Sequence, residues 1–517
     1  MATSKANRYP LTLAILLLVL AALGFVTLLR TPPPHVDEAY RASRAYALIR
    51  TGRAFGILEA GVYDRYEGYW TFFPFLETWF TALPIRLLGL SLWALRLTSL
   101  AFGLVLLGAL YAIGDRLGGP VLGLVTVFLV GFSKSFIYSS HLARQDIIVA
   151  AFGFGAIALY LADRGSRFTG QALLAGLLAG LAFEVHPNGM IYAPVVIALC
   201  LVENGRSILR AGRFRAFLTG VGAGLACYVA IHILPYPQTY RALTQLGYSA
   251  THTPPFLAPN PLLWLRGLYE AGFLLHYISR THTLLGLLAI PVLLQRHSPA
   301  DRRLLVLLGT LFLAVGLCIR NKLYYYGILY TPALELLLAA ALLRLAQISR
   351  QAFKDGKRWL ALASGLAVLG SGLFLAVTIV HNLAPLRENA LPDYEKAAAR
   401  IRQAVPPGST VMGTQTFWFA MPDERYLSWE QLVYYQRYAP GTTLEDGLRE
   451  FRPDYLIVDS HLRHYIIDLE GPPSGYRGAL ALPKADWDRF LAERGRLVEE
   501  IETRNYGQVD VYRITWP

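Results

Sequence analysis

Long apolar runs separated by short polar connections dominate the first three quarters of this sequence. The first run follows Lys5 and Arg8 and contains about 20 apolar residues, enough to span a bilayer as a helix. Further apolar runs lie near residues 92–113, 120–138, 147–162, 171–185, 189–203, 216–234, 284–295, 303–319, 326–343 and 359–380. The pattern therefore predicts about eleven transmembrane helices.

The connections between these runs differ in charge, which predicts their orientation. We expect an uncleaved first helix with its N-terminus in the cytoplasm, because a cleaved signal peptide has a shorter apolar core. With alternation from there, every predicted cytoplasmic connection contains Arg or Lys, as in "ENGRSILRAGRFR" and "QRHSPADRR". The predicted outer connections are mixed in charge; they are 31–91, 139–146, 186–188, 235–283 and 320–325. This asymmetry supports the predicted topology.

Residues 382–517 are more polar and form a separate predicted domain after a membrane domain of residues 1–381. "YEKAAARIRQAV" and the start of "DWDRFLAERGRLVEEIE" have helical spacing. "RPDYLIVDS" and "QVDVYRITW" have the pattern of strands, and "PPGSTVMGT" that of a turn entering a strand. This alternation predicts a small α/β domain, which the topology places outside the cytoplasm. In 235–283, the prolines of "THTPPFLAPNPLLW" predict a loop, a candidate lid.

Composition supports a polytopic membrane protein. The 517 residues are 54% hydrophobic and only 16% charged, whereas soluble domains carry roughly 25% charged residues. The net charge of +13 is explained by the basic cytoplasmic connections, and no basic stripe with interleaved aromatic residues predicts nucleic-acid binding. The three cysteines lie inside apolar runs, which argues against a disulfide framework or a zinc site.

Ionisable residues gather in the predicted outer connections, where they are costly unless they pair or line a wet cavity. The candidates are Asp37 and Glu38 in "PPPHVDEAY", Arg144 and Asp146 in "SSHLARQD", His186 in "FEVHPNG", and Lys322 and Tyr325 in "CIRNKLYYYGILYTP". A general base needs a carboxylate beside the acceptor hydroxyl, and an anionic leaving group needs fixed cations. No Walker A motif, nucleophile elbow or dinucleotide glycine pattern is present.

Each candidate also has a structural interpretation. Asp37 is expected to cap an interfacial helix and to pair with Arg41 in that interpretation. Arg144 and Asp146 pair with each other or cap a span, and His186 is a satisfied turn residue. Lys322 snorkels to the membrane interface, and the neighbouring tyrosines form an aromatic belt.

The motifs "HVDEAYRASRAY" and "LARQD" resemble the lipid-dependent membrane glycosyltransferases of the GT-C fold, in particular the family 39-like protein mannosyltransferases and aminoarabinose transferases. The resemblance covers roughly residues 10–345. It implies transfer of a hexose or pentose from a polyprenyl-phosphate donor to a lipid, glycan or protein acceptor at the outer face of the cell membrane. It further implies that Asp37 is the base with Glu38 in support.

The same resemblance assigns the other candidates to substrate binding. The acid of the second outer turn corresponds to Asp146, next to Arg144, while Lys322 and Tyr325 face the lipid phosphate. His186 stands where the family often has a basic residue, so its role is open. Single displacement is expected to invert the anomeric centre. A D-x-D motif is absent from the sequence, so no obligatory metal or other cofactor is expected.

Two departures and two alternatives accompany this interpretation. The chain lacks the central insertion of the eukaryotic mannosyltransferases, and its extra domain is C-terminal, as in the bacterial lipid-modifying branch. A transporter or flippase of a lipid-linked saccharide predicts ionisable groups near mid-membrane on broken helices and paired repeats, whereas the polar residues here cluster at predicted outer ends. An O-antigen ligase or polymerase is closer in chemistry and stays open.

Overall fold

The computed structural model describes residues 8–54, 56, 58, 75–163, 167–243, 255–278, 280–294, 298–466 and 482–517. The chain divides into two compact units. The first contains Met1–Leu28, Ser99–Pro235 and His252–Arg387, and the second contains Leu29–Thr98, Tyr236–Thr251 and Glu388–Pro517. The boundary predicted between residues 381 and 382 stays a prediction.

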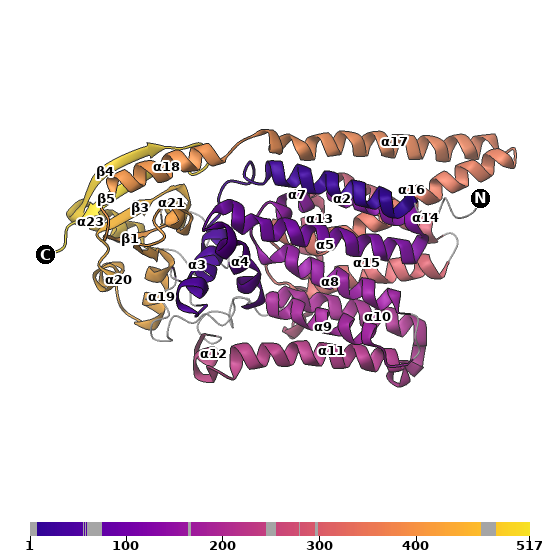
Figure 1. The fold of residues 1–517 in the computed structure, drawn as a ribbon, viewed down its shortest axis with the longest axis horizontal. Helices are drawn as coiled ribbons and strands as arrows, with labels where there is room; N and C mark the ends of the chain where they lie inside the picture. The colour runs from indigo at the N-terminus through magenta and orange to yellow at the C-terminus, as the bar shows by residue number, and fades with distance from the viewer. Residues whose placement is uncertain are drawn as a thin grey trace. The chain divides into compact units, whose positions relative to one another are not determined.

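The first unit is built from apolar helices (Figure 1). Its α-helices are α2 (Arg8–Thr27), most of α5 (Leu92–Gly118), α6 (Pro120–Gly131), α7 (Lys134–Ser140), α8 (Gln145–Ala162), α9 (Gly170–Val185), α10 (Tyr192–Asn204), α11 (Gly212–Tyr228), α13 (Pro261–Ile278), α14 (Arg280–Leu294), α15 (Pro299–Cys318), α16 (Thr331–Lys354) and α17 (Arg358–Leu383). Short 3-10 segments include η3 (Pro187–Ile191), η4 (Gly205–Arg210) and η8 (Tyr324–Leu329), and η5 (Val229–Ile233) is a π-helical turn. Every apolar run predicted from the sequence falls on one or more of these helices.

Among the described residues, seven helical segments are long and apolar enough to cross a membrane, or eight if the bent pair α6 and α7 forms one span. Shorter apolar helices include Gly170–Val185 and Leu284–Leu294. The predicted helical membrane architecture is confirmed, while the count of eleven spans stays a prediction. The loop predicted over 235–283 is wrong at α13, because Pro261 begins that helix, a position where proline is favourable.

Glycines allow α9 to approach α11 closely (Figure 1). Gly176 and Gly180 of α9 face Gly220 and Gly224 of α11, a pair of small-xxx-small motifs. A Cβ atom on Gly220 would lie 2.0 Å from the carbonyl oxygen of Leu173. Such an approach has no room for a side chain, so the backbones themselves form this contact.

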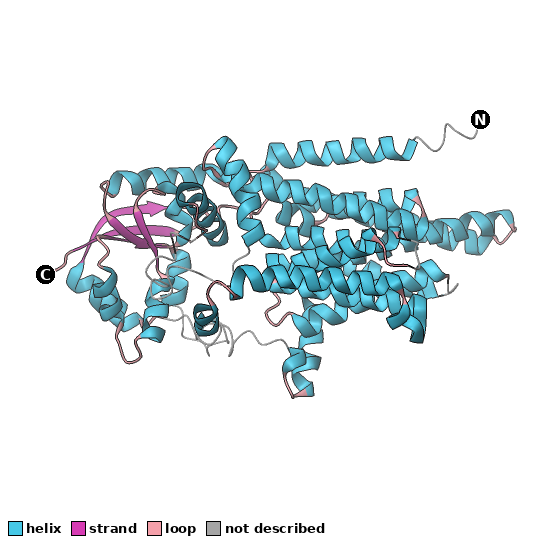
Figure 2. Ribbon diagram, turned by 60° about the horizontal axis from the view of Figure 1, so that its bottom comes forward, coloured by secondary structure: helices cyan, strands magenta, loops and turns pink. Residues whose placement is uncertain are grey.

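The second unit carries one five-stranded sheet in the order β2-β1-β3-β5-β4 (Figure 2, magenta). Its strands are β1 (Thr410–Gly413), β2 (Arg425–Ser428), β3 (Tyr455–Val458), β4 (Gly495–Glu502) and β5 (Gln508–Ile514). Its helices are α3 (Val36–Thr51), α4 (Phe75–Leu88), α12 (Pro237–Leu243), α18 (Leu391–Ala404), η10 (Gln415–Ala420), α19 (Glu430–Tyr438), α20 (Leu444–Phe451), α21 (Ser460–Ile466) and α23 (Lys484–Arg494). β1 is parallel to β2 and β3, whereas β5 is antiparallel to β3 and β4.

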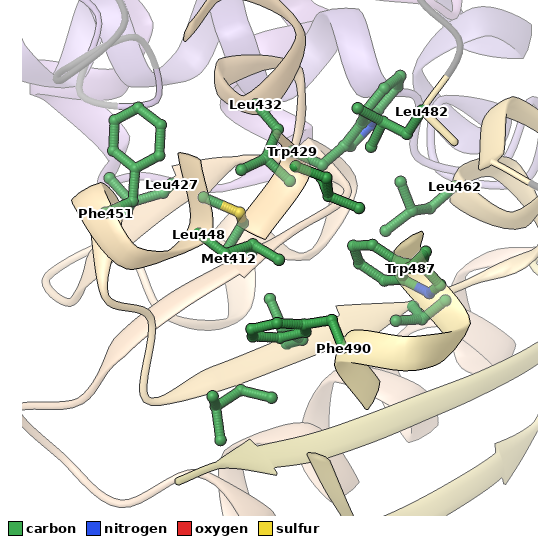
Figure 3. Packing of buried hydrophobic residues seen from close by; sticks show 14 of the residues in the cluster. Met412, Leu427, Trp429, Leu432, Leu448, Phe451, Leu462, Leu482, Trp487 and Phe490 are labelled. Atoms are coloured by element: carbon green, nitrogen blue, oxygen red, sulfur yellow. The ribbon is translucent and has the colours of Figure 1, made fainter. Parts of the chain in front are cut away.

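Alternate residues of the strands face opposite sides of the sheet. On one side, Met412 of β1 and Leu456 of β3 join a buried core with Trp429, Trp487 and Phe490 (Figure 3). On the other side α18 packs against β4 and β5. The predicted small α/β region is thus confirmed, including the helix in "YEKAAARIRQAV" and the strands in "RPDYLIVDS" and "QVDVYRITW".

Candidate functional site

Helix α3 begins directly after His35, which is its N-cap. The His35 Nδ1 atom accepts a hydrogen bond from the backbone N–H of Asp37 at 3.2 Å. The Glu38 carboxylate accepts one from the backbone N–H of His35 at 3.0 Å, which completes a capping box. The interpretation of Asp37 as the helix cap is therefore wrong, because His35 and Glu38 satisfy the helix terminus.

Glu38 is also bound by Arg96 from the start of α5. The Arg96 Nε and Nη2 atoms each donate to a different Glu38 carboxylate oxygen at 2.8 Å, and Nη2 also donates to the Pro32 carbonyl at 2.9 Å. Both side chains of the ion pair are 0% exposed. A buried bidentate pair of this kind fixes geometry strongly, and removing one partner leaves an uncompensated buried charge. Glu38 thus anchors α3, and the catalytic role predicted for it in support of Asp37 stays a prediction.

Asp37 differs from Glu38 in its surroundings. Its side chain is 28% exposed, and one carboxylate oxygen lies 3.3 Å from His35 Nδ1. Of the adjacent acids, Asp37 is the one whose carboxylate reaches solvent.

The first unit brings together three residues that the sequence analysis singled out. Arg144 Nε donates to Asp146 Oδ2 at 2.8 Å, and both side chains are buried. The guanidinium carbon of Arg144 lies 3.6 Å from the centre of the Tyr325 ring, a cation–π contact. The predicted pairing of Arg144 with Asp146 is confirmed. Their ion pair and the ring together hold a planar cation in a fixed orientation.

Tyrosines extend from this cation along η8. The rings of Tyr324, Tyr325 and Tyr326 contact one another edge to face, with centroids 5.2 and 4.8 Å apart. The hydroxyl groups of Tyr138 and Tyr324 are 2.7 Å apart. His186 lies beside the Tyr326 ring at 6.0 Å, and its Nδ1 accepts the Asn188 backbone N–H at 3.1 Å. The turn role considered for His186 is therefore present in the structure.

Lys322 lies between α15 and η8, with its side chain only 3% exposed. Its Nζ donates to the Ile319 carbonyl at 2.7 Å and lies 3.7 Å from a Glu270 carboxylate oxygen. Burial lowers the pKa of Lys322 to about 8, although Glu270 acts in the opposite direction. Snorkelling does not describe this residue, because the ammonium group is inside the protein. An ammonium group of this kind can bind a phosphate group.

Sequence reasoning missed several partners of these residues. Arg96 lies inside an apolar run, and Glu270 lies on α13, which was predicted to be a loop. A second buried pair joins Glu184, at the end of α9, to His232 in the π-helical turn, with 2.9 Å between Oε1 and Nε2. An isolated ionisable residue in an apolar segment was the available signal for Arg96, Glu270 and His232, whereas Glu184 lies in the turn "FEVHPNG" that the sequence analysis quoted. In the described ranges, no group of three or more His, Cys, Asp or Glu residues could hold a metal ion, and the expectation about metals stays untested.

The first unit thus contains a multi-span helical membrane arrangement with a buried cation beside tyrosines, and the second unit contains a small sheet with helices. Residues 73–233 match the family described as dolichyl-phosphate-mannose-protein mannosyltransferase. No curated protein matches the sequence significantly. The match includes "LARQD" but begins after "HVDEAYRASRAY". The predicted GT-C fold is confirmed by the solved structures described next.

Solved structures show the same fold. ArnT from Cupriavidus metallidurans bound to undecaprenyl phosphate is 14% identical, with a TM-score of 0.62 and coverage of 96% of this chain and 97% of that chain. The apo oligosaccharyltransferase of Archaeoglobus fulgidus is 13% identical, with a TM-score of 0.58 and coverage of 96% and 74%. The arabinofuranosyltransferase AftD from Mycobacteria is 16% identical, with a TM-score of 0.51 and coverage of 98% and 40%. This chain has the GT-C fold and is a multi-pass membrane protein.

Proposed function

We propose that this protein transfers a sugar from a polyprenyl-phosphate donor to an acceptor hydroxyl or amine at the outer face of the cell membrane. The observation that carries the proposal is the buried Arg144, paired with Asp146 and stacked on Tyr325, three residues along the chain from Lys322. It occurs in a fold similar over 96% of the chain to a structure solved with undecaprenyl phosphate. The acceptor is a lipid, a glycan or a protein.

In this proposal the cations bind the donor and stabilise its leaving group. Departure of the sugar leaves the polyprenyl phosphate with additional negative charge, which fixed cations stabilise in a site of low dielectric constant. Lys322 is suited to this because its ammonium has one backbone acceptor and a carboxylate only at 3.7 Å. Arg144 supplies a second positive group whose position is set by Asp146 and Tyr325.

Asp37 is the proposed general base. Its partly exposed carboxylate accepts the proton of the acceptor while the acceptor oxygen or nitrogen attacks the anomeric carbon. The sugar–phosphate bond breaks in the same displacement, so the anomeric centre inverts. Glu38 contributes through the ion pair with Arg96, which holds the helix that carries Asp37.

The experiment is a transfer assay with purified protein in lipid vesicles and a labelled polyprenyl-phosphate sugar. Asp37→Asn is expected to lower turnover by at least about 100-fold without loss of folded protein. Asp488→Asn, a change at an exposed carboxylate on α23, is the matched control and should leave turnover unchanged. Turnover close to wild type in Asp37→Asn would refute the assignment of the base. A protein that moves donor between leaflets and forms no new glycosidic bond would instead support the flippase alternative.

A further inference from the structure

We propose that the carboxyl end of the small sheet positions the catalytic helix α3, and that Tyr40 is the positioning residue that joins them. The inference rests on the proposed function, in which Asp37 on this helix is the base. It assigns a role in catalysis to the C-terminal region that follows the membrane helices. All of the contacts involved lie within the second compact unit.

The topology brings polar residues to one edge of the sheet. β1 and β2 are parallel and end at Gly413 and Ser428, so their carboxyl ends share an edge. Gln415 of η10 follows β1, and Glu430 at the start of α19 follows β2. In open α/β sheets this edge is where ligands bind. In this protein, a side chain of α3 forms hydrogen bonds at this edge.

That side chain is the phenol of Tyr40. Its hydroxyl donates to Glu430 Oε2 at 2.9 Å and lies 3.1 Å from Ser428 Oγ. Gln415 Nε2 donates to the Tyr40 hydroxyl and to Ser428 Oγ, both at 2.6 Å. Burial raises the pKa of Glu430, while the hydrogen bonds from Tyr40 and Gln415 act in the opposite direction. These polar groups have little exposure to solvent. Displacement of the phenol would therefore leave Glu430, Ser428 and Gln415 each without one hydrogen-bond partner.

Two further hydrogen bonds join this region to the chain of the same helix, the first buried and the second at an exposed carboxylate. Tyr506 lies between β4 and β5. Its hydroxyl donates a hydrogen bond of 3.0 Å to the carbonyl of Pro34, which precedes α3. Near the other end, the Tyr46 hydroxyl donates to Asp423 Oδ1 at 2.8 Å. The C-terminal region therefore contacts α3 before its first turn, at its second turn and near its last turn.

Of the hydrogen bonds from the C-terminal region to the helix itself, that of Tyr40 is nearest to Asp37 in the sequence. Asp37 and Tyr40 are three residues apart, so they share one face of the helix and are separated by about 4.5 Å along its axis. Arg41, four residues from Asp37, lies on this face as well and binds Glu77 of α4, whereas Glu38 fixes another face through Arg96. With the Tyr40 contact the helix is restrained against rotation about its axis. A misplacement of a catalytic group by about 1 Å costs roughly 100-fold in rate.

The test compares Tyr40→Phe with Tyr46→Phe in the full-length protein. Both changes remove one phenol hydroxyl from the same helix, but Tyr46 bonds an exposed carboxylate. We expect Tyr40→Phe to lower kcat by about 10- to 100-fold while the donor KM stays unchanged. Tyr46→Phe should keep kcat within about twofold of wild type. Glu430→Gln retains an oxygen acceptor for Tyr40 and should preserve most of kcat, as a conservative variant.

The outcomes separate this inference from the proposed function. A Tyr40→Phe protein with wild-type kcat, alongside an inactive Asp37→Asn protein, overturns the positioning role and leaves the base in place. Equal losses in kcat and in donor affinity also overturn it, because they indicate a general structural defect. If Tyr40→Phe does not fold, Ser428→Ala decides the matter, with an expected loss in kcat of about 3- to 10-fold and no change in donor KM. An active Asp37→Asn protein refutes the proposed function itself.

Discussion

The central guanidinium carbon of Arg144 lies 3.6 Å from the centre of the Tyr325 ring, while Arg144 Nε binds Asp146 at 2.8 Å. The two residues come from the N-cap of α8 and from η8, which are far apart in the sequence. The contact joins two of the predicted outer connections. The Arg144 guanidinium group is thus held in position by Asp146 and Tyr325 together.

Replacement of Arg144 by lysine should weaken donor binding even though the charge is kept. Lysine lacks the planar guanidinium that stacks on Tyr325 while binding Asp146. We expect Arg144→Lys to raise the donor KM by about tenfold, measured by steady-state kinetics in vesicles. Arg213→Lys is the matched control, because Arg213 lies 3.5 Å from the centre of the Tyr160 ring and also binds a carboxylate, that of Glu203. An equal rise in both variants would contradict a specific role for Arg144.

The pH dependence of donor binding should report the ionisation of Lys322. Its pKa is lowered to about 8 by burial, so the ammonium loses its proton as the pH rises through that value. Above that pH, kcat/KM for the donor is therefore expected to fall by about tenfold per pH unit, which gives the pH profile an alkaline limb. Lys322→Arg should abolish the limb, because arginine stays protonated.

Glu270 provides the internal check on that assignment. Its carboxylate raises the pKa of Lys322, so Glu270→Gln should move the alkaline limb to lower pH. An alkaline limb at the wild-type pH in both Lys322→Arg and Glu270→Gln would show that a group other than Lys322 titrates. The measurement is the same pH profile, with the folded fraction monitored at each pH.

The Glu38–Arg96 ion pair should matter for stability. Glu38→Gln removes one buried charge and leaves Arg96 uncompensated, which is expected to cost about 3 kcal/mol of unfolding free energy. Asp37→Asn changes the adjacent, partly exposed carboxylate and should alter the unfolding free energy by less than about 1 kcal/mol. Thermal unfolding in detergent compares the two. Similar losses from both substitutions would contradict the division of roles between the acids.

The close approach of α9 and α11 predicts a sharp difference between two glycines of one helix. Gly220→Ala places a methyl group against the Leu173 carbonyl and should lower the unfolding free energy by about 1–3 kcal/mol. Gly222→Ala meets no heavy atom within 4 Å and should be neutral or stabilising by up to about 1 kcal/mol. Melting temperatures of the two variants measure the contrast. A stable Gly220→Ala protein would show that the helices can separate without cost.

Local patterns in the sequence predicted much of the fold. Apolar runs identified the helices of the membrane unit, because burial in lipid requires long apolar segments whatever their neighbours are. Period-two alternation and helical spacing identified β3, β5 and α18 for the same local reason. The strands β2 (Arg425–Ser428) and β4 (Gly495–Glu502) were not predicted. The helix α13 was missed because its flanking prolines suggested a loop.

The sequence by itself determined that acidic, basic and tyrosine residues occur in the connections between apolar runs. The resemblance favoured Asp37 over Glu38 as the base, but the residues themselves, which are adjacent and chemically alike, did not show how their surroundings differ. The tertiary structure decided that, because Arg96 folds against Glu38 and leaves Asp37 partly exposed. It likewise decided that Arg144 meets Tyr325 and that Tyr40 meets Ser428 and Glu430. Pairing across distant segments depends on how the elements pack together, which no local pattern of residues encodes.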